Sequence, residues 1–217
     1  MKTVGHNKIL KSLRNAEHKG RLAHAYMLTG PSQIGKTTLA IDVACMVNCQ
    51  QDNRPCSECS PCKRILQGIH ADVKIVRVSN SDTATSNKFS IGIDQIRQLE
   101  KEANLKPYEG ACRVFIVEET NAMSIEASNA LLKTLEEPPA QVLMLLLSSE
   151  PDTIPATIVS RCQQIKMHPI TSDVIYGHIR SITQFEDAYI KEIAAESYGR
   201  MGWAIQVIDN RDMLDKR

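Results

Sequence analysis

Short apolar segments alternate with longer amphipathic segments over most of the chain. The short segments predict strands, because they are rich in Val, Ile and Leu; they lie at residues 25–28, 73–78, 113–117, 142–147 and 164–167. Between them, apolar residues recur at the spacing of one helix face, at about 6–20, 36–48, 93–105 and 124–137. This alternation predicts a five-stranded parallel sheet between helices, an α/β fold.

The pattern changes after Pro169, since residues 171–217 have helical spacing and no strand segment. We therefore expect two domains, at 1–168 and 169–217, the second a small all-helical lid. Residues 49–62 hold prolines and cysteines and predict a loop or knuckle. Residues 79–90 are polar and predict a flexible surface loop.

Composition limits the classes of function without choosing among them. The net charge is +1 over 217 residues, so charge alone indicates neither nucleic acid nor membrane as a partner. The longest apolar run, residues 142–147, is too short to span a bilayer, and the polar start resembles no signal peptide. An odd count of seven cysteines favours thiols and a metal site over disulfides. We expect a cytoplasmic protein with no membrane partner.

A phosphate-binding loop follows the first predicted strand. Residues 30–37 read Gly-x-x-x-x-Gly-Lys-Thr, between a strand and a helix. Gly30 and Gly35 let backbone N–H groups wrap a phosphate, Lys36 supplies a positive charge, and the Thr37 hydroxyl can ligate Mg²⁺. Thr38 continues the site into the helix. The alternative is a chance match on a tight turn.

Two adjacent acids end the third predicted strand. P-loop ATPases place an acid that holds Mg²⁺ through water at such a strand end, and a glutamate beside it polarises the attacking water. Glu118 and Glu119 occupy these positions, with Glu118 one methylene longer than the usual Asp. The alternative is a solvated acidic pair.

Four cysteines lie within residues 49–62 and suit a structural metal. Their spacing lets sulfurs converge on one tetrahedral Zn²⁺ and leaves no open position for catalysis. The predicted ligands are Cys49, Cys56, Cys59 and Cys62. The alternative is a set of free thiols.

Further motifs carry a family resemblance. His24-Ala25-Tyr26 precedes the loop, residues 129–139 read NALLKTLEEPP, residues 157–162 end in Ser-Arg-Cys, and residues 202–205 read Gly-Trp-Ala-Ile. With these motifs the chain resembles the delta-prime subunits of bacterial DNA polymerase III clamp loaders, relatives of gamma/tau in the AAA+ class of P-loop proteins.

The resemblance implies a subunit of a five-membered loader that places the sliding clamp on primed DNA. Its partners would be the gamma/tau and delta subunits, the clamp and the DNA, and its cofactors ATP or ADP with Mg²⁺. Arg161 would be an arginine finger for the neighbouring subunit's ATP, Ser149 would sense the γ-phosphate, and Val4 and His6 would lie near the adenine. The alternative for Arg161 is a surface arginine that caps a helix. The alternative for Ser149 is a strand-end serine whose hydroxyl is hydrogen-bonded to backbone.

Two departures bear on catalysis. Glu118 stands where Asp is usual, and Gly202 stands where related ATPases carry an arginine, with Arg200 two residues earlier. They favour an accessory delta-prime subunit with weak or absent turnover and no polymerase active site. Lys36, Thr37 and Glu119 favour the alternative, a gamma/tau-like ATPase. A third possible function, that of a small-molecule kinase with the same phosphate loop, would not explain the Ser-Arg-Cys motif. The family's helical collar domain is expected after residue 217.

Overall fold

The computed structural model describes residues 2–80 and 89–209 and contains the predicted five-stranded parallel sheet. The strands stand in the order β2-β5-β6-β1-β7, and every neighbouring pair is parallel. Their bounds are β1 Ala25–Thr29, β2 Val73–Val76, β5 Arg113–Val117, β6 Val142–Ser148 and β7 Gln163–Lys166. The predicted fold class is confirmed.

Side chains of the three central strands, β5, β6 and β1, point alternately into two separate apolar cores. Tyr26 and Leu28 of β1 pack with helices α1, α2 and α3, whereas Ala25 and Met27 of the same strand pack with α4, α5 and α6. β5 and β6 divide in the same way. Because both faces of these strands are covered, β1, β5 and β6 are buried throughout, which explains their continuous apolar sequence.

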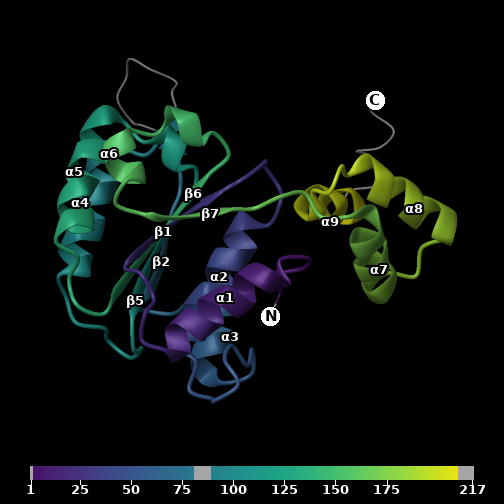
Figure 1. Cartoon of the computed structure of the whole chain (residues 1–217), viewed down its shortest axis with the longest axis horizontal. Helices are drawn as coiled ribbons and strands as arrows, with labels where there is room; N and C mark the ends of the chain where they lie inside the picture. Colours follow the sequence, from purple (N-terminus) through teal and green to yellow (C-terminus); the bar gives the residue numbers. More distant parts are fainter. Residues whose placement is uncertain (1, 81–88, 210–217) are drawn as a thin grey trace.

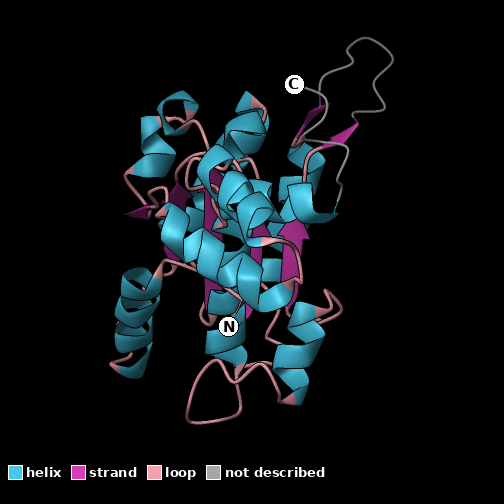
Figure 2. Cartoon of the chain, turned by 90° about the vertical axis from the view of Figure 1, so that its right-hand side faces the viewer, coloured by secondary structure: helices cyan, strands magenta, loops and turns pink. Residues whose placement is uncertain are grey.

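Helices cover both faces of the sheet, with α4, α5 and α6 on one side and α1, α2 and α3 on the other (Figure 1). Figure 2 shows the strands enclosed between these layers. The bounds are α1 Asn7–His18, α2 Lys36–Asn48, α3 Ser60–Leu66, α4 Ile93–Ala103, α5 Ile125–Glu136 and α6 Ala156–Val159. Short 3₁₀ turns lie at η1 Thr120–Ala122 and η2 Pro151–Thr153.

Several predicted boundaries were wrong. The predicted loop at 49–62 contains the start of α3, because Pro61 sits in the first helical turn, where the missing N–H has no helical partner to lose. The second strand ends at Val76, two residues early, and the fifth runs one residue earlier than predicted. The ends of the predicted loop at 79–90 pair as β3 Ser79–Asn80 and β4 Phe89–Ser90, and 81–88 lie outside the described residues.

Three further helices follow the sheet and share a core of their own. They are α7 Ser172–Ile182, α8 Asp187–Glu196 and α9 Met201–Asp209, and the predicted helical region beyond 209 lies outside the described residues. Val4 and Ile170 pack against this core, so the N-terminal segment contacts the C-terminal helices. Among the residues that the structure describes, no helix is both long and apolar enough to cross a bilayer.

Candidate nucleotide and metal sites

The carboxyl ends of the central strands meet at one edge of the sheet and open onto a cavity. Register pairs Thr29 with Ser148 and Val117 with Leu146, so β1, β5 and β6 end close together. In parallel α/β sheets, ligands bind outside these strand ends. The cavity has a volume of about 420 Å³. Seven predicted residues line it: Gly35, Lys36, Thr37, Thr38, Glu118, Glu119 and Ser149.

The loop after β1 is built as its glycine pattern requires. Gly30 has φ of 151°, and a Cβ there would lie 2.6 Å from the carbonyl oxygen of Met167, so only glycine fits this turn. Gly35 is the N-cap of α2, and the helix N-terminus therefore faces the cavity. Lys36 Nζ donates to the carbonyl oxygens of Gly30 (2.7 Å) and Pro31 (2.8 Å), which holds the ammonium over the loop.

Lys36 and Glu119 are electrostatically linked across the cavity. Burial lowers the pKa of Lys36, and the Glu119 charge opposes that shift. Glu119 adopts a left-handed backbone (φ 52°) where β5 passes into η1. This arrangement puts an acid and a cation on the wall of one cavity.

Glu118 has a partner that sequence reasoning missed. Its Oε2 accepts a hydrogen bond from Arg77 Nε at 2.9 Å, within an ion pair from the end of β2. Glu118 therefore lines the cavity with part of its charge already compensated. Arg77 directly follows the edge strand β2, and no local sequence pattern marks it as a partner of Glu118.

The C-terminal helices contact the phosphate loop through backbone. The N–H of Gly202 donates to the carbonyl oxygen of Gln33 at 2.7 Å, and Gln33 Nε2 donates to Gln206 Oε1 at 2.6 Å. A Cβ at position 202 would lie 2.7 Å from that same Gln33 oxygen. Any side chain at 202 would therefore push α9 away from the loop. Arg200 donates to the Ser197 carbonyl and lies over the Trp203 ring.

Val4 and His6 line a second cavity, of about 510 Å³, which shares Gly35, Thr38 and Gly202 with the first. The segment that carries them is fixed by Asp42, whose carboxylate accepts backbone N–H bonds from Lys2 and Thr3. Sequence reasoning missed Asp42. A lone acid on the apolar face of α2, between Leu39 and Val43, was the available signal.

Ser148 and Ser149 both line the first cavity, the one that Lys36 and Glu119 also line. The predicted Ser149 lies just after β6, while the buried Ser148 donates to Asn121 Oδ1 at 3.2 Å and accepts from the N–H of Glu150. Ser148 is thus the serine with defined hydrogen bonds. It was missed because it reads as the last residue of an apolar strand.

Arg161 follows α6 and is held by groups of its own chain. Its Nη2 lies 2.6 Å from Glu136 Oε1, and its Nη1 donates to the Thr157 carbonyl oxygen at 2.8 Å. Its side chain is one-third exposed. Arg161 is not one of the residues that line the two cavities described above.

The four predicted cysteine ligands converge. The Sγ atoms of Cys49, Cys56, Cys59 and Cys62 all lie within 4.8 Å of one another. Two of the separations, 3.9 Å and 4.0 Å, match the roughly 3.8 Å between sulfurs bound at about 2.3 Å to one tetrahedral Zn²⁺. Backbone N–H groups of Cys59 and Glu58 donate to Cys56 Sγ and lower the pKa of that thiol to about 6. The donor set fits zinc.

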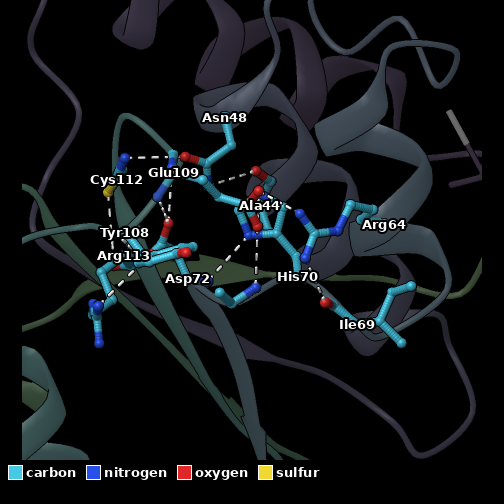
Figure 3. A network of polar contacts seen from close by, with 12 residues as sticks. Ala44, Asn48, Arg64, Ile69, His70, Asp72, Tyr108, Glu109, Cys112 and Arg113 are labelled. Atoms are coloured by element: carbon cyan, nitrogen blue, oxygen red, sulfur yellow. Dashed lines mark hydrogen bonds and ion pairs between the residues drawn. The ribbon is translucent and has the colours of Figure 1, made fainter.

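A polar network around the buried Asp72 joins this cysteine segment to the sheet (Figure 3). Asp72 accepts backbone N–H bonds from Tyr108, Glu109 and Gly110, and it pairs with Arg113 at 3.3 Å. Arg64 of α3 pairs with Glu109, and Asn48 of α2 accepts the N–H of Cys112. The ends of α2, α3, β2 and β5 are thereby tied together.

Comparison with known families gives one extended match. The model of the family described as "DNA polymerase III, delta subunit" matches residues 5–171. DNA polymerase III subunit tau of Bacillus subtilis is 38% identical over 95% of this chain and 36% of its own length. Subunit tau/gamma of Haemophilus influenzae is 34% identical over 99% of the chain and 31% of its own length. The chain thus spans about a third of these relatives.

Subunit delta' of Bacillus subtilis is also similar, with 29% identity over 97% of this chain and 61% of its own length. Among solved structures, the RuvB Holliday junction branch migration motor of Thermotoga maritima aligns over 98% of the chain and 63% of its own length. Its TM-score is 0.63 at 19% identity. A gamma subunit-related protein of the same organism aligns over 87% of this chain and 57% of its own, with a TM-score of 0.54 at 20% identity. These structures support the fold.

Proposed function

The chain belongs to the DNA polymerase III delta-subunit family of clamp-loader proteins, and on that premise we propose that it is a nucleotide-binding, delta-prime-like accessory subunit. In this proposal it binds ATP or ADP with Mg²⁺ in the cavity around Lys36 and contributes Arg161 to a neighbour's ATP. The assembled loader would place the sliding clamp on primed DNA in the cytoplasm, with gamma/tau and delta subunits as partners.

One relationship carries the accessory role, the contact between Gly202 and Gln33. A nucleotide in the phosphate cavity would meet loop amides, Lys36 and the N-terminus of α2. The C-terminal helices close this cavity with backbone and Gln206, since a side chain at 202 would collide with the Gln33 carbonyl. An arginine from this position therefore has no room to stabilise charge during hydrolysis, which favours binding over turnover.

A gamma/tau-like ATPase is the second candidate. The intact loop and Glu119 support it, as do the Bacillus subtilis tau and Haemophilus influenzae tau/gamma subunits, which are 38% and 34% identical to the chain, compared with 29% for the delta' relative. In that case Glu119 would polarise the attacking water and Glu118 would hold Mg²⁺ through water.

The proposal includes a structural Zn²⁺ on Cys49, Cys56, Cys59 and Cys62, and a division into a nucleotide-binding domain at 1–168 and a helical lid at 169–217. The sulfur separations support the metal. The separate core of α7, α8 and α9 supports the division.

ATP binding and phosphate release by the isolated chain test the proposal. We expect micromolar or tighter ATP binding that Lys36→Ala abolishes and Lys101→Ala, on the exposed face of α4, leaves intact. Binding without sustained phosphate release supports the accessory subunit. Steady release that Glu119→Gln abolishes would establish the ATPase instead, and no binding of nucleotide would refute both.

A further inference from the structure

The C-terminal turn of α5 has a carbonyl group that the helix itself cannot satisfy. A helical carbonyl accepts the N–H of the residue four positions further along the chain. For Leu135 that residue is Pro139, which has no N–H. The last backbone bond of the helix runs from the N–H of Glu137 to the carbonyl oxygen of Lys133, at 3.0 Å. Since Leu135 is buried, its carbonyl needs a partner from another part of the chain.

His24 supplies that partner. Its Nε2 lies 3.1 Å from the carbonyl oxygen of Leu135. Because a carbonyl oxygen only accepts, Nε2 carries the hydrogen and donates it. The backbone of His24 is fixed as well, since its own carbonyl oxygen accepts the N–H of Met144 on β6 at 2.8 Å. His24 directly precedes β1, so this one residue joins the central strands to the end of α5, 111 positions later in the sequence.

The turn that His24 holds carries the partner of Arg161. Glu136 directly follows Leu135, and its Oε1 lies 2.6 Å from Arg161 Nη2. Leu135 of α5 and Ile158 of α6 are buried in the same apolar core, so the end of α5 packs beside the helix that precedes Arg161. The Glu136 side chain is 50% exposed. Packing alone therefore does not fix its carboxylate, and the position of its backbone decides where the carboxylate lies.

We propose that His24 is a positioning residue for Arg161. The hydrogen bond to Leu135 fixes the last turn of α5, this turn fixes the Glu136 carboxylate, and the carboxylate orients the guanidinium toward the phosphates of a neighbouring subunit's nucleotide. The inference rests on the proposed role of Arg161 in the neighbour's ATP turnover.

Loss of the donor at position 24 should displace Glu136. The buried Leu135 carbonyl can then regain a partner only if the turn opens toward water, because an unpaired buried acceptor is costly. A displacement of about 1 Å in a group that orients the reaction can lower a rate by about 100-fold. The phosphate loop should be unaffected, since it follows the far end of β1 from His24.

ATP turnover per assembled loader, reconstituted from the full chain and its cognate subunits, tests this proposal. His24→Leu removes the donor, and we expect it to lower kcat by about tenfold at unchanged KM, less than the loss of an arginine finger causes. His24→Asn, whose amide is too short to reach Leu135, should repeat that loss. His24→Gln places an amide N–H where Nε2 was and should keep about half of the turnover or more. His18→Leu, on the exposed face of α1, is the matched control.

A cycle with Arg161→Ala separates positioning from folding. His24→Leu combined with Arg161→Ala should lower kcat no further than Arg161→Ala alone, because His24 acts only through the arginine. A residue that only stabilised the fold would lower the free energy of unfolding and leave kcat of the assembled loader unchanged. ATP binding by this chain's own cavity should stay unchanged in every variant of position 24.

The outcomes separate the inference from its premise. Unchanged kcat in both His24→Leu and His24→Asn, with kcat reduced in Arg161→Ala, would overturn the positioning role and leave the role of Arg161 standing. Equal losses in His24→Gln and His24→Leu would show that the hydrogen bond does not position the turn. Additive losses in the double variant would show that His24 acts independently of Arg161. Full turnover in Arg161→Ala would overturn the proposed role of Arg161, and the positioning role with it.

Discussion

Arg77 and Glu118 form an ion pair beside the phosphate cavity, with Nε and Oε2 2.9 Å apart. The pair spans the ends of two neighbouring parallel strands, β2 and β5, at the edge where a metal-bound phosphate is expected. Because the Arg77 side chain is 63% exposed, the interaction is screened and modest in energy.

We predict that Arg77→Gln will strengthen Mg²⁺-dependent ATP binding. Without the guanidinium, the negative charge of Glu118 at the metal position is no longer offset by a neighbouring positive charge, and the apparent Mg²⁺ affinity should rise by up to about fivefold. Titration of Mg²⁺ at fixed ATP measures the effect. Arg97→Gln, which breaks a surface pair with Asp94, is the control. A weaker Mg²⁺ dependence in Arg77→Gln would contradict this role of the pair.

A methyl group at position 202 should separate α9 from the phosphate loop. In Gly202→Ala the new Cβ meets the Gln33 carbonyl at 2.7 Å, so the contact must open. We expect a loss of about 1–3 kcal/mol in the free energy of unfolding, together with weaker ATP binding.

Gly177→Ala is the matched control for that change. Position 177 lies inside α7 with nothing within 4 Å of the added Cβ, so this variant should gain about 0.5–1 kcal/mol. Urea unfolding of both variants checks the pair. Equal effects of the two substitutions would show that the Gly202 contact is unimportant.

Much of this architecture could be predicted because its signals are local. β1, β5 and β6 are buried on both faces and read as continuous apolar segments, and the phosphate loop has a fixed spacing between a strand and a helix. The cysteine positions are equally local. Their convergence followed from short spacing alone, and the helix that begins within them was missed because Pro61 reads as a loop residue.

The remaining site residues depend on contacts between segments far apart in the chain. Asp42 acts on residues forty positions earlier, Arg77 on Glu118, and Gln33 on α9. The spacing of apolar residues along the chain gives no information about contacts between such distant residues. Asp42 was the one with a sequence signal, since a charged residue on an otherwise apolar helix face needs a buried partner.

The cysteine cluster should hold a single zinc ion that stabilises residues 49–62. We expect purified protein to contain one zinc ion per chain. Chelation should lower the melting temperature, because the free energy of binding a structural metal contributes to the free energy of folding. Cys59→Ser should lose most of the metal. Cys112→Ser, at a thiol outside the cluster, should keep it. A protein that purifies without metal and melts unchanged with chelator would refute the site.

Because of Asp72, the free energy of unfolding should depend on pH at acidic pH. Burial by itself raises the pKa of Asp72, but the N–H groups of the 108–110 loop and Arg113 outweigh it, so the pKa falls below its ordinary 3.8. A lowered folded-state pKa contributes stability above the unfolded pKa and loses it as pH falls through the folded value. Asp72→Asn should therefore cost about 3 kcal/mol at neutral pH.

The difference between wild type and Asp72→Asn should begin to shrink as the pH falls below about 4, where Asp72 of the unfolded chain becomes protonated, and should disappear below the lowered folded-state pKa. Denaturant unfolding at a series of pH values measures it. Asp94→Asn, at a side chain 94% exposed, should change stability little at any pH. A difference that stays constant down to pH 2 would show that the Asp72 charge is not the source of its stabilising effect.

Arg161 should act on a neighbouring subunit and depend on Glu136 for its position. Glu136 and the Thr157 carbonyl hold the guanidinium at 2.6 Å and 2.8 Å. Exposed ion pairs contribute at most about 1 kcal/mol, so Glu136 can orient the guanidinium without preventing Arg161 from also contacting a phosphate. In a loader reconstituted with its cognate subunits, Arg161→Ala should lower ATP turnover by about 10³-fold, the usual effect of removing an arginine finger. Nucleotide binding by this chain should stay unchanged.

Glu136→Ala tests the positioning role by a double-mutant cycle. We expect a smaller loss of turnover than with Arg161→Ala, at unchanged KM, and no further loss when both substitutions are combined, because Glu136 acts only through the arginine. Glu137→Ala, at the adjacent exposed position, is the matched control. Additive losses in the double variant would show that Glu136 acts independently of Arg161. Full turnover in Arg161→Ala would show that this arginine does not serve a neighbouring nucleotide.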